Sequence, residues 1–564
     1  MFCMNRLSFL FSLFFSVVFS QAEVPTDYFS SPLKIPLQLS GTFGELRGNH
    51  FHSGLDIRTQ QKEGIPIYAP ADGYINRIKV QHFGYGKALY IQHPNGYSTV
   101  YAHLREYAGD IQAYVKKEQY KAELYEVEAF PSASELPVKK GDLIGYTGNS
   151  GSSGGPHLHY EIRDASSRPM NPLLFGIEIA DTRKPLINSV FVYPIGEEAH
   201  VNQNNNAQQL RLIPKNDGSY TSEKITAYGT LGFGISAIDQ QNDANNRNGL
   251  YKIETNFNGT KKIEVLFDRF SFGETRYINR YIDYGYLKDK KSTIQKLFVE
   301  RNNPLSIFKS SHQNGYITLA DTLDAIYTIV VSDFKKNKVE IFIPIEGKKD
   351  SIKINKTIPK NNYQVFAKEG KEIKEGKFTI YIPKDALYED ALLQIEANGD
   401  VLSFHQDNIP IHSNITIQAD ISHYDEESKN KTYIGRLNYK GDATFSGNNR
   451  SGNTLTARVR TFGNYGLAID TIAPTITPAN FADGKWISSN KTLELKIEDK
   501  ESGIKGYRAE INGKWVLMEY EHKKNLLIYD FNDNIISESE NNLKVIVTDN
   551  VGNSTKFEAT FFRK

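Results

Sequence analysis

The chain has 564 residues, a formal net charge of +1 and 24% charged residues. This length predicts about four domains of roughly 150 residues each, and the charged and aromatic content argues against a wholly disordered chain. The near-neutral balance excludes a generic nucleic-acid binder, and the single cysteine excludes a disulfide framework, a Cys-ligated zinc site and an iron–sulfur cluster. Any bound metal must therefore be held by His, Asp or Glu.

The first 22 residues are typical of an export signal. Arg6 supplies positive charge, Leu7 to Phe19 is an apolar run interrupted by serines, and the small residues Ser20 and Ala22 close it. The run is shorter than the roughly 20 apolar residues of a membrane-spanning helix. We predict a signal peptide over residues 1–22 and a mature protein without a transmembrane segment, which is periplasmic, bound to the cell surface or secreted. A retained membrane anchor is the alternative.

Residues 31–180 differ in composition from the rest of the chain, because they are rich in glycine and contain most of the histidines. The turn Pro94-Asn95-Gly96 separates two short apolar runs and predicts a β-hairpin. We predict a compact antiparallel β domain here. Residues 110–136 interrupt the strand pattern with Lys, Glu and Tyr, which indicates a segment with a helix laid over the sheet. The predicted strands are Ile65–Tyr68, Gly73–Val80, Ala88–Gln92, Ser98–Ala102 and Leu143–Tyr146.

After residue 180 the pattern changes to alternating apolar and polar residues with Asn, Gly and Asp turns, which is typical of β-sandwich modules. We divide this part into modules at residues 181–345, 346–468 and 469–564, the last of them immunoglobulin-like. The first module is expected to hold an insertion around residues 280–315, which includes a helix near Thr293–Val299.

Two of these modules resemble each other in sequence. Ile235–Asp239 corresponds to Leu495–Asp499, and Ile329–Asp333 corresponds to Val545–Asp549. We interpret them as repeated immunoglobulin-like modules, with chance similarity among Asn-rich strands as the alternative. The predicted fold class is therefore mainly β.

Two short motifs in the first domain carry residues suited to metal chemistry. One is His52-Ser53-Gly54-Leu55-Asp56, and the other is His157-Leu158-His159. Residues two apart in a strand point to the same face, so His157 and His159 should share one cleft. Each motif is weak alone, because His-x-His is most often a polar strand face.

Together the two motifs supply a carboxylate and two imidazoles with one imidazole to spare. Three protein ligands with an open position for water are typical of catalytic zinc, and a spare imidazole can take the proton from that water. A third motif, Tyr101-Ala102-His103-Leu104, offers His103 either as an ordinary histidine or as a group that stabilises an oxyanion in the cleft.

The three motifs, in this order, resemble the lysostaphin/LytM-type zinc peptidases, whose fold is described as a duplicated hybrid motif. Two supporting segments also resemble that family: Pro66–Gly73 and Val138–Gly151. The resemblance covers about residues 40–175, a quarter of the chain. It departs from the family at residues 105–137, a segment that is longer than usual and is expected to affect specificity or access to the groove.

The resemblance implies a role for each matching residue. His52, Asp56 and His159 would bind zinc, His157 would be the general base, and His103 would stabilise the transition state. It implies an exported metalloendopeptidase that hydrolyses the peptides of cell-wall peptidoglycan, without indicating which bond is cut.

Two other functions remain as alternatives. One is a non-catalytic regulator or activator of cell-wall hydrolases, and the other is a wall-binding or adhesin-like protein whose β modules bind a wall or protein partner. Two residues near the first motif are weaker candidates. His50 is interpreted as a surface or supporting residue, and Arg47 either as a ligand for a substrate carboxylate or as an ordinary surface charge.

Overall fold

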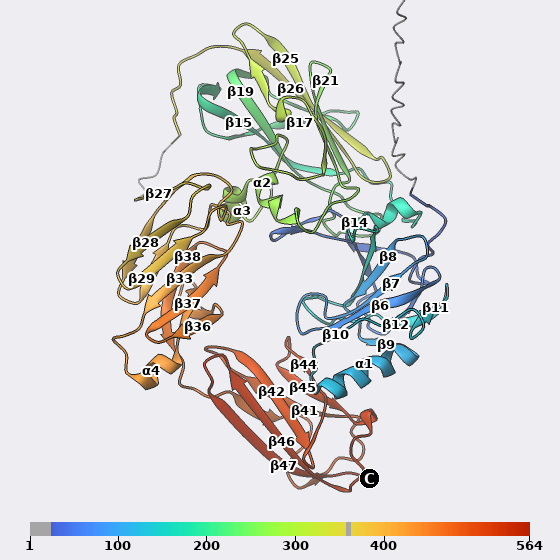
Figure 1. Ribbon diagram of the computed structural model, residues 1–564. Helices are drawn as coiled ribbons and strands as arrows, with labels where there is room; N and C mark the ends of the chain where they lie inside the picture. The colour runs from blue at the N-terminus through green and yellow to red at the C-terminus, as the bar shows by residue number, and fades with distance from the viewer. Residues whose placement is uncertain (1–23, 357–361) are drawn as a thin grey trace, which may run out of the picture.

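The computed structural model describes residues 24–356 and 362–564 of the chain. The predicted signal peptide lies outside the described residues. The chain forms an N-terminal β domain followed by three further β units, arranged as a ring in which the last unit returns to the first (Figure 1). Within the described ranges, no helix is long and apolar enough to cross a membrane. The mainly β fold class is confirmed.

The N-terminal domain is built on an antiparallel sheet with the strand order β1-β4-β13-β8-β7-β6-β10, and a smaller sheet, β5-β12-β9, packs beside it. The main sheet consists of β1 (Leu39–Gly41), β4 (Leu55–Arg58), β6 (Gly73–Val80), β7 (Lys87–Gln92), β8 (Ser98–Ala102), β10 (Val127–Ala129), β11 (Pro137–Val138), β13 (His157–Arg163) and β14 (Pro169–Met170). The other elements are the hairpin β2 (Leu46–Arg47) and β3 (His50–Phe51), the strands β5 (Pro66–Tyr68), β9 (Glu106–Tyr107) and β12 (Leu143–Tyr146), and the 3-10 helix η1 (Pro172–Phe175).

The segment that interrupts this domain contains the expected helix, α1 (Gly109–Ala122). Its buried residues are Ile111, Val115 and Gln119. This spacing of four places one side of the helix against the domain, as expected of an amphipathic helix.

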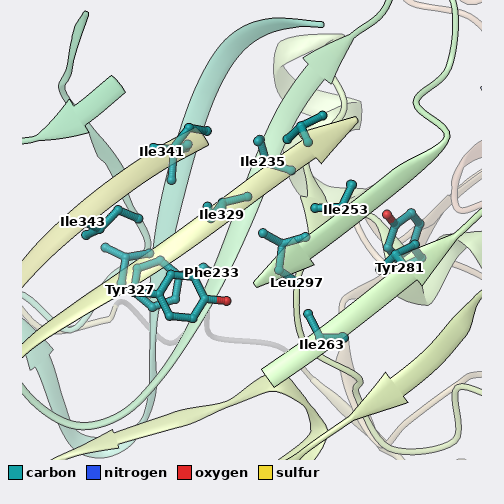
Figure 2. Packing of buried hydrophobic residues seen from close by; sticks show 14 of the residues in the cluster. Phe233, Ile235, Ile253, Ile263, Tyr281, Leu297, Tyr327, Ile329, Ile341 and Ile343 are labelled. Atoms are coloured by element: carbon teal, nitrogen blue, oxygen red, sulfur yellow. The ribbon is translucent and has the colours of Figure 1, made fainter. Parts of the chain in front are cut away.

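The second unit is a large sheet with the order β16-β15-β19-β26-β25-β20-β21-β23. Its strands alternate apolar and polar residues, and the apolar faces form one core that includes Phe233, Ile329 and Tyr327 (Figure 2). The strands are β15 (Leu186–Val201), β16 (Gln208–Leu210), β17 (Leu212–Pro214), β18 (Tyr220–Ser222), β19 (Ile225–Ile238), β20 (Lys252–Phe257), β21 (Thr260–Leu266), β22 (Gln295–Lys296), β23 (Phe308–Ser311), β24 (Ile317–Leu319), β25 (Asp324–Ser332) and β26 (Lys338–Gly347).

The prediction of a helix near Thr293–Val299 is wrong. That stretch contains β22, and the helices of the insertion come earlier, as α2 (Ile278–Tyr281) and α3 (Tyr284–Lys290) between the 3-10 helices η2 (Thr275–Tyr277) and η3 (Gln313–Gly315). The local reason is capping. The Asp283 side chain accepts a hydrogen bond from the Tyr286 amide and starts α3, and Lys291, in the left-handed conformation, ends it before Thr293.

The first two units share a core. Phe43 and Phe51, from the N-terminal domain, belong to the apolar cluster of the second unit. The Phe51 ring lies 5.4 Å from that of Phe270, and the Phe43 ring lies 5.0 Å from the same ring. Burying an aromatic side chain is among the largest single contributions to packing. The hairpin that leads to His52 is therefore anchored by the second unit.

The third unit begins at residue 362 and has two facing sheets, β28-β29-β33-β37-β36 and β31-β32-β38-β34-β35, around one apolar core. Its elements are β27 (Tyr363–Val365), β28 (Lys371–Glu375), β29 (Phe378–Ile382), β30 (Ala391–Leu393), β31 (Ile395–Asn398), β32 (Val401–Phe404), β33 (Ile415–Asp420), α4 (Glu426–Lys431), β34 (Thr432–Leu437), β35 (Ala443–Phe445), β36 (Asn448–Ser451), β37 (Thr454–Val459) and β38 (Gly463–Ile469).

The fourth unit is likewise a pair of sheets, β39-β41-β45-β44 and β40-β47-β46-β42-β43. Its strand pairing repeats part of the second unit: β42 pairs with β46 and β46 with β47, as β20 pairs with β25 and β25 with β26. The elements are β39 (Thr475–Pro478), β40 (Lys485–Trp486), β41 (Thr492–Glu498), β42 (Ile504–Ile511), β43 (Lys514–Trp515), β44 (Met518–Glu521), β45 (Leu526–Asp530), η4 (Phe531–Asp533), β46 (Glu540–Asp549) and β47 (Ser554–Phe562).

The fourth unit packs against the side of α1 that faces away from the N-terminal domain, and it thereby completes the ring (Figure 1). Lys116 forms an ion pair with Asp533, whose side chain is only 1% exposed, and the Tyr120 hydroxyl donates to the same carboxylate over 2.6 Å. The Tyr120 ring also packs edge-on against Trp515, with centroids 5.2 Å apart. The long segment of residues 105–137 therefore provides the surface on which the end of the chain docks.

Candidate metal centre

Three side chains from the first and last motifs meet where β4 and β13 pair in the interior of the main sheet. β4 and β13 are antiparallel neighbours, and their register places Asp56 directly opposite His159. His52 lies just before β4, and the chain turns between them at Gly54. A Cβ atom on Gly54 would lie 2.3 Å from the Tyr160 carbonyl oxygen, so only glycine lets the two strands approach so closely here.

The donor atoms of the three side chains converge. His52 Nε2 lies 3.0 Å from Asp56 Oδ1 and 3.0 Å from His159 Nδ1, and His159 Nδ1 lies 2.9 Å from Asp56 Oδ1. All three residues are buried. Ligands of a tetrahedral zinc ion are about 3.3 Å apart, since each bond is about 2.0–2.1 Å. The spacing therefore fits one metal ion.

The outer nitrogen of each ring has its own partner. His52 Nδ1 lies 2.8 Å from the Thr42 carbonyl oxygen, and His159 Nε2 lies 2.8 Å from Glu161 Oε1. Each outer nitrogen must donate its proton to such an acceptor, so each inner nitrogen presents a lone pair. Two lone pairs and a carboxylate oxygen pointing at one position are a donor set for a cation.

Two arginines balance the two buried carboxylates from outside. Arg47 Nη2 lies 2.5 Å from Asp56 Oδ2, and Arg163 Nε lies 2.7 Å from Glu161 Oε2. Burial would raise the pKa of Asp56, but the neighbouring rings of His52, His157 and His159 outweigh it and hold that pKa well below its usual range. Both carboxylates are thus ionised, and each keeps one oxygen facing a histidine.

The charge balance at His159 also favours a cation. Burial by itself favours the neutral ring, but the carboxylates of Asp56 and Glu161 outweigh it and raise the pKa of His159 to about 9. The centre therefore attracts positive charge, which a metal ion supplies without a proton on the inner nitrogen.

His103 and His157 lie beside this group. Their rings are 4.8 Å apart, and His157 Nε2 is 3.4 Å from Asp56 Oδ1. Each ring is held through Nδ1, His103 by the Ser150 carbonyl at 2.9 Å and His157 by the Gly155 carbonyl at 2.8 Å. In both rings Nε2 is therefore the nitrogen that these backbone carbonyls leave available. His103 has a φ of +62°, a strained conformation for a non-glycine residue that is typical of functional sites.

The structure thus brings together all five residues that the sequence predicts for the site. Of the two weaker candidates, His50 lies outside this group and Arg47 contacts one of its members. His50 is exposed, with Nδ1 2.8 Å from the Gly48 carbonyl oxygen. Arg47 is engaged by Asp56 and Glu45, so it orients a candidate ligand instead of offering a free charge to substrate.

Sequence reasoning missed two residues that support the centre. Glu161 is fully buried and accepts hydrogen bonds from His159 and from Ser53 Oγ at 2.6 Å, and the Tyr85 hydroxyl donates to the same carboxylate. The strand period gave a signal for Glu161, because it lies two residues after His159 and so on the same face. Tyr85 had no such signal, because it comes from the loop between β6 and β7.

The fourth unit contacts two loops beside the candidate metal centre. Lys523 Nζ lies 3.1 Å from Asn149 Oδ1, next to the Ser150 carbonyl that holds His103. The His522 ring lies 4.7 Å from the ring of Phe83, which is in the same loop as Tyr85. One turn of the fourth unit therefore contacts both loops that border the candidate site.

Comparison with known proteins finds similarity in two parts of the chain. Residues 50–128 and 120–172 match the model of Peptidase family M23, and residues 362–470 match that of a Zu5-like domain. The catalytic domain of lysostaphin from Staphylococcus simulans aligns with 25% of this chain and 91% of its own, at 22% identity and a TM-score of 0.19.

Curated relatives align over the same region. The DD-carboxypeptidase/endopeptidase Mpg of Neisseria meningitidis serogroup B is 37% identical over 122 residues, which are 22% of each chain. The peptidoglycan DD-endopeptidase ShyA of Vibrio cholerae is 32% identical over 131 residues, 23% of this chain and 24% of its own. The similarity thus spans about a quarter of these relatives or less. Residues 50–172 of this chain form a Peptidase family M23 domain of the LytM type.

Proposed function

We propose that this protein is an exported zinc-dependent endopeptidase that hydrolyses peptide bonds of bacterial peptidoglycan. The observation that carries the proposal is the convergence of His52 Nε2, Asp56 Oδ1 and His159 Nδ1 beside the rings of His103 and His157. The named activities of the relatives support the same class of reaction. Export is inferred from the sequence of residues 1–22.

The donor set fits zinc. Two imidazole nitrogens and one carboxylate oxygen are typical of catalytic zinc sites, and the mature chain would have no cysteine to complete a structural one. When bound, zinc would supply Lewis-acid activation of water and of the scissile carbonyl. His52, Asp56 and His159 would hold it, and Glu161 and the Thr42 carbonyl would fix the orientation of the two rings.

The two remaining histidines divide the proton chemistry. His157 Nε2 faces the same cleft as Asp56 Oδ1, where it would take a proton from the attacking water and return it to the leaving amine. His103 would donate a hydrogen bond from its cleft-facing nitrogen to the oxygen of the tetrahedral intermediate. The Gly155 and Ser150 carbonyls hold each ring in place before substrate binds.

The decisive experiment combines zinc content with digestion of purified peptidoglycan by the full-length mature protein. The relatives are named as DD-endopeptidases, so the fragments are examined first for cleavage of D,D cross-links by mass spectrometry. We expect chelator-sensitive release of peptides. The variant H157A should keep its zinc and lose activity by about 10²–10⁴-fold, the usual contribution of a general base.

His50→Ala is the matched control, because His50 is exposed and makes no contact with the centre. It should cleave as the unchanged protein does. Zinc-loaded protein that releases no fragments would contradict the proposal and favour a regulator of other wall hydrolases. Cleavage by H157A at the full rate would show that the reaction uses another base.

A further inference from the structure

A second group of acidic side chains lies outside the candidate metal centre, at the junction of the first two units. Asp181, Asp239 and Asp333 come from three distant parts of the sequence, and one carboxylate oxygen of each lies within 4.8 Å of the others. Asp239 follows β19 and Asp333 follows β25, so the strands of the second unit deliver both to the same end. Asp239 and Asp333 are buried.

No lysine or arginine among the described residues forms an ion pair with these three carboxylates. The neighbouring cation, Arg183, is directed away, with hydrogen bonds to Gln240 and to the Ala244 carbonyl. Burial and the charges of Asp181 and Asp333 raise the pKa of Asp239 to about 7. The group therefore holds repelling charges, which the charges of Arg183 and Lys335 offset only in part.

Unpartnered oxygen atoms point to a missing ligand. Asp239 and Asn248 are joined by two backbone hydrogen bonds of 2.9 and 3.0 Å, and both side chains line one small cavity with Asp181. Asp239 is 5% exposed and Asn248 is 2% exposed, yet Oδ1 of each has no hydrogen-bond partner. A buried polar atom left without a partner destabilises the folded state. A cation in this cavity would satisfy both oxygens.

A matching group of three aspartates is present in the fourth unit. Asp470, Asp499 and Asp549 bring their oxygens within 4.8 Å of one another. Asp499 follows β41 as Asp239 follows β19, and Asp549 ends β46 as Asp333 follows β25. Asp470-Thr-Ile-Ala-Pro and Asp181-Thr-Arg-Lys-Pro share their first, second and fifth residues. Two units with different neighbours thus carry one arrangement of carboxylates.

The chemistry of the donors selects the cation. The candidate ligands are carboxylate and amide oxygens, with no histidine or cysteine in the group, and such donors suit hard cations. Calcium takes oxygen ligands at about 2.3–2.6 Å, so two oxygens on one ion lie at most about 5 Å apart. We propose that Asp181, Asp239 and Asp333, with Oδ1 of Asn248, bind one calcium ion.

The position of this site suggests what the ion does. Gln241, two residues after Asp239, accepts a hydrogen bond from the Leu39 amide over 2.8 Å and donates to the Leu37 carbonyl over 2.9 Å. Leu39 belongs to β1, which pairs with the strand that carries Asp56. Calcium would thus fix the joint through which the second unit supports the peptidase domain.

The test is calcium binding to the full-length, zinc-loaded protein, measured by equilibrium dialysis with radioactive calcium. The variant D239N keeps the size of the side chain and removes its charge. We expect it to bind one calcium ion fewer per chain than the unchanged protein. Calcium should also raise the melting temperature of the unchanged protein more than that of D239N, because an ion that binds only the folded state stabilises it.

Asp243→Asn is the matched control. Asp243 is an exposed residue of the same loop, and asparagine readily adopts its left-handed backbone conformation. It should bind as much calcium as the unchanged protein. If D239N does not fold, D181N replaces it, because Asn Oδ1 can still accept the Arg183 amide. Equal calcium binding by the unchanged protein and D239N, or no calcium bound by either, would overturn the proposal.

Discussion

His159 donates a hydrogen bond from Nε2 to Oε1 of Glu161 over 2.8 Å, within the interior of the peptidase domain. Glu161 is in turn held by Arg163, Ser53 and Tyr85. A carboxylate behind a metal-binding histidine fixes the tautomer and the direction of the ring and makes the ring a stronger ligand. The ring orientation that suits a metal is therefore set before any metal binds.

Glu161→Gln should weaken zinc binding by about 10–100-fold, the usual effect of losing such a supporting residue. The glutamine has nearly the same shape but lacks the charge that opposes Arg163 and strengthens the His159 donor. Competition with a chromophoric chelator measures the affinity. Glu106→Gln, a change at a half-exposed side chain outside the centre, is the control. Unchanged affinity in E161Q would show that Glu161 serves packing alone.

Gly54→Ala should lower both zinc content and activity. A Cβ at this position would meet the Tyr160 carbonyl oxygen at 2.3 Å, so β4 must move away from β13 and separate Asp56 from His159. Overpacking of this kind costs about 1–3 kcal/mol. Gly48→Ala is the matched control, because a Cβ there has no atom within 4 Å. Metal analysis of both variants decides the matter, and equal zinc content would count against the strand-approach argument.

Asp533→Ala should open the ring. Its buried carboxylate forms an ion pair with Lys116 and accepts a hydrogen bond from Tyr120. Loss of hydrogen bonds to a charged group typically costs about 1.5–3 kcal/mol. Small-angle X-ray scattering should show an increased radius of gyration. Arg508→Ala removes an ion pair with Glu123 at the same interface, but both side chains are about half exposed, so the ring should stay closed. Identical scattering from D533A and the unchanged protein would indicate that other contacts hold the ring.

The peptidase domain should lose stability as the pH falls below about 6.5, the usual pKa of histidine, in part through His93. This ring is buried between the Asp72 carbonyl, 2.8 Å from Nδ1, and Thr99 Oγ1, 2.8 Å from Nε2. Burial lowers its pKa, so the folded protein keeps the ring neutral at a pH where the unfolded chain takes up a proton. Stability is therefore full above the unfolded pKa and falls below it.

His93→Asn tests this dependence. The Asn amide can still donate to the Asp72 carbonyl but does not titrate, so the variant should lose less stability than the unchanged protein between pH 7 and pH 5, a range of roughly two units around the histidine pKa. Thermal unfolding across that range provides the comparison. The same pH slope in both proteins would assign the effect to other histidines.

The motifs of the peptidase domain could be predicted from sequence because they are local. Within His157-Leu158-His159, the strand period alone places two rings on one face. The hairpin at Pro94-Asn95-Gly96 and the helix within residues 110–136 likewise depend on residues close in sequence, and both are present. The expected helix near Thr293–Val299 failed, because its boundaries depended on the capping of α3 and not on composition.

The sequence by itself determined that the chain is mainly β and that its first domain resembles the LytM-type peptidases, because side-chain period and turn residues act over a few positions. Only the tertiary structure decided that Glu161 and Arg47 support the centre, that Phe51 anchors the hairpin before His52 in the second unit, and that Asp533 closes the ring on α1. Apart from Glu161, which lies two residues after His159 on the same strand, these contacts join residues of different strands or of distant parts of the chain. Their partners are chosen by strand register and domain packing, and neither leaves a local pattern in the sequence.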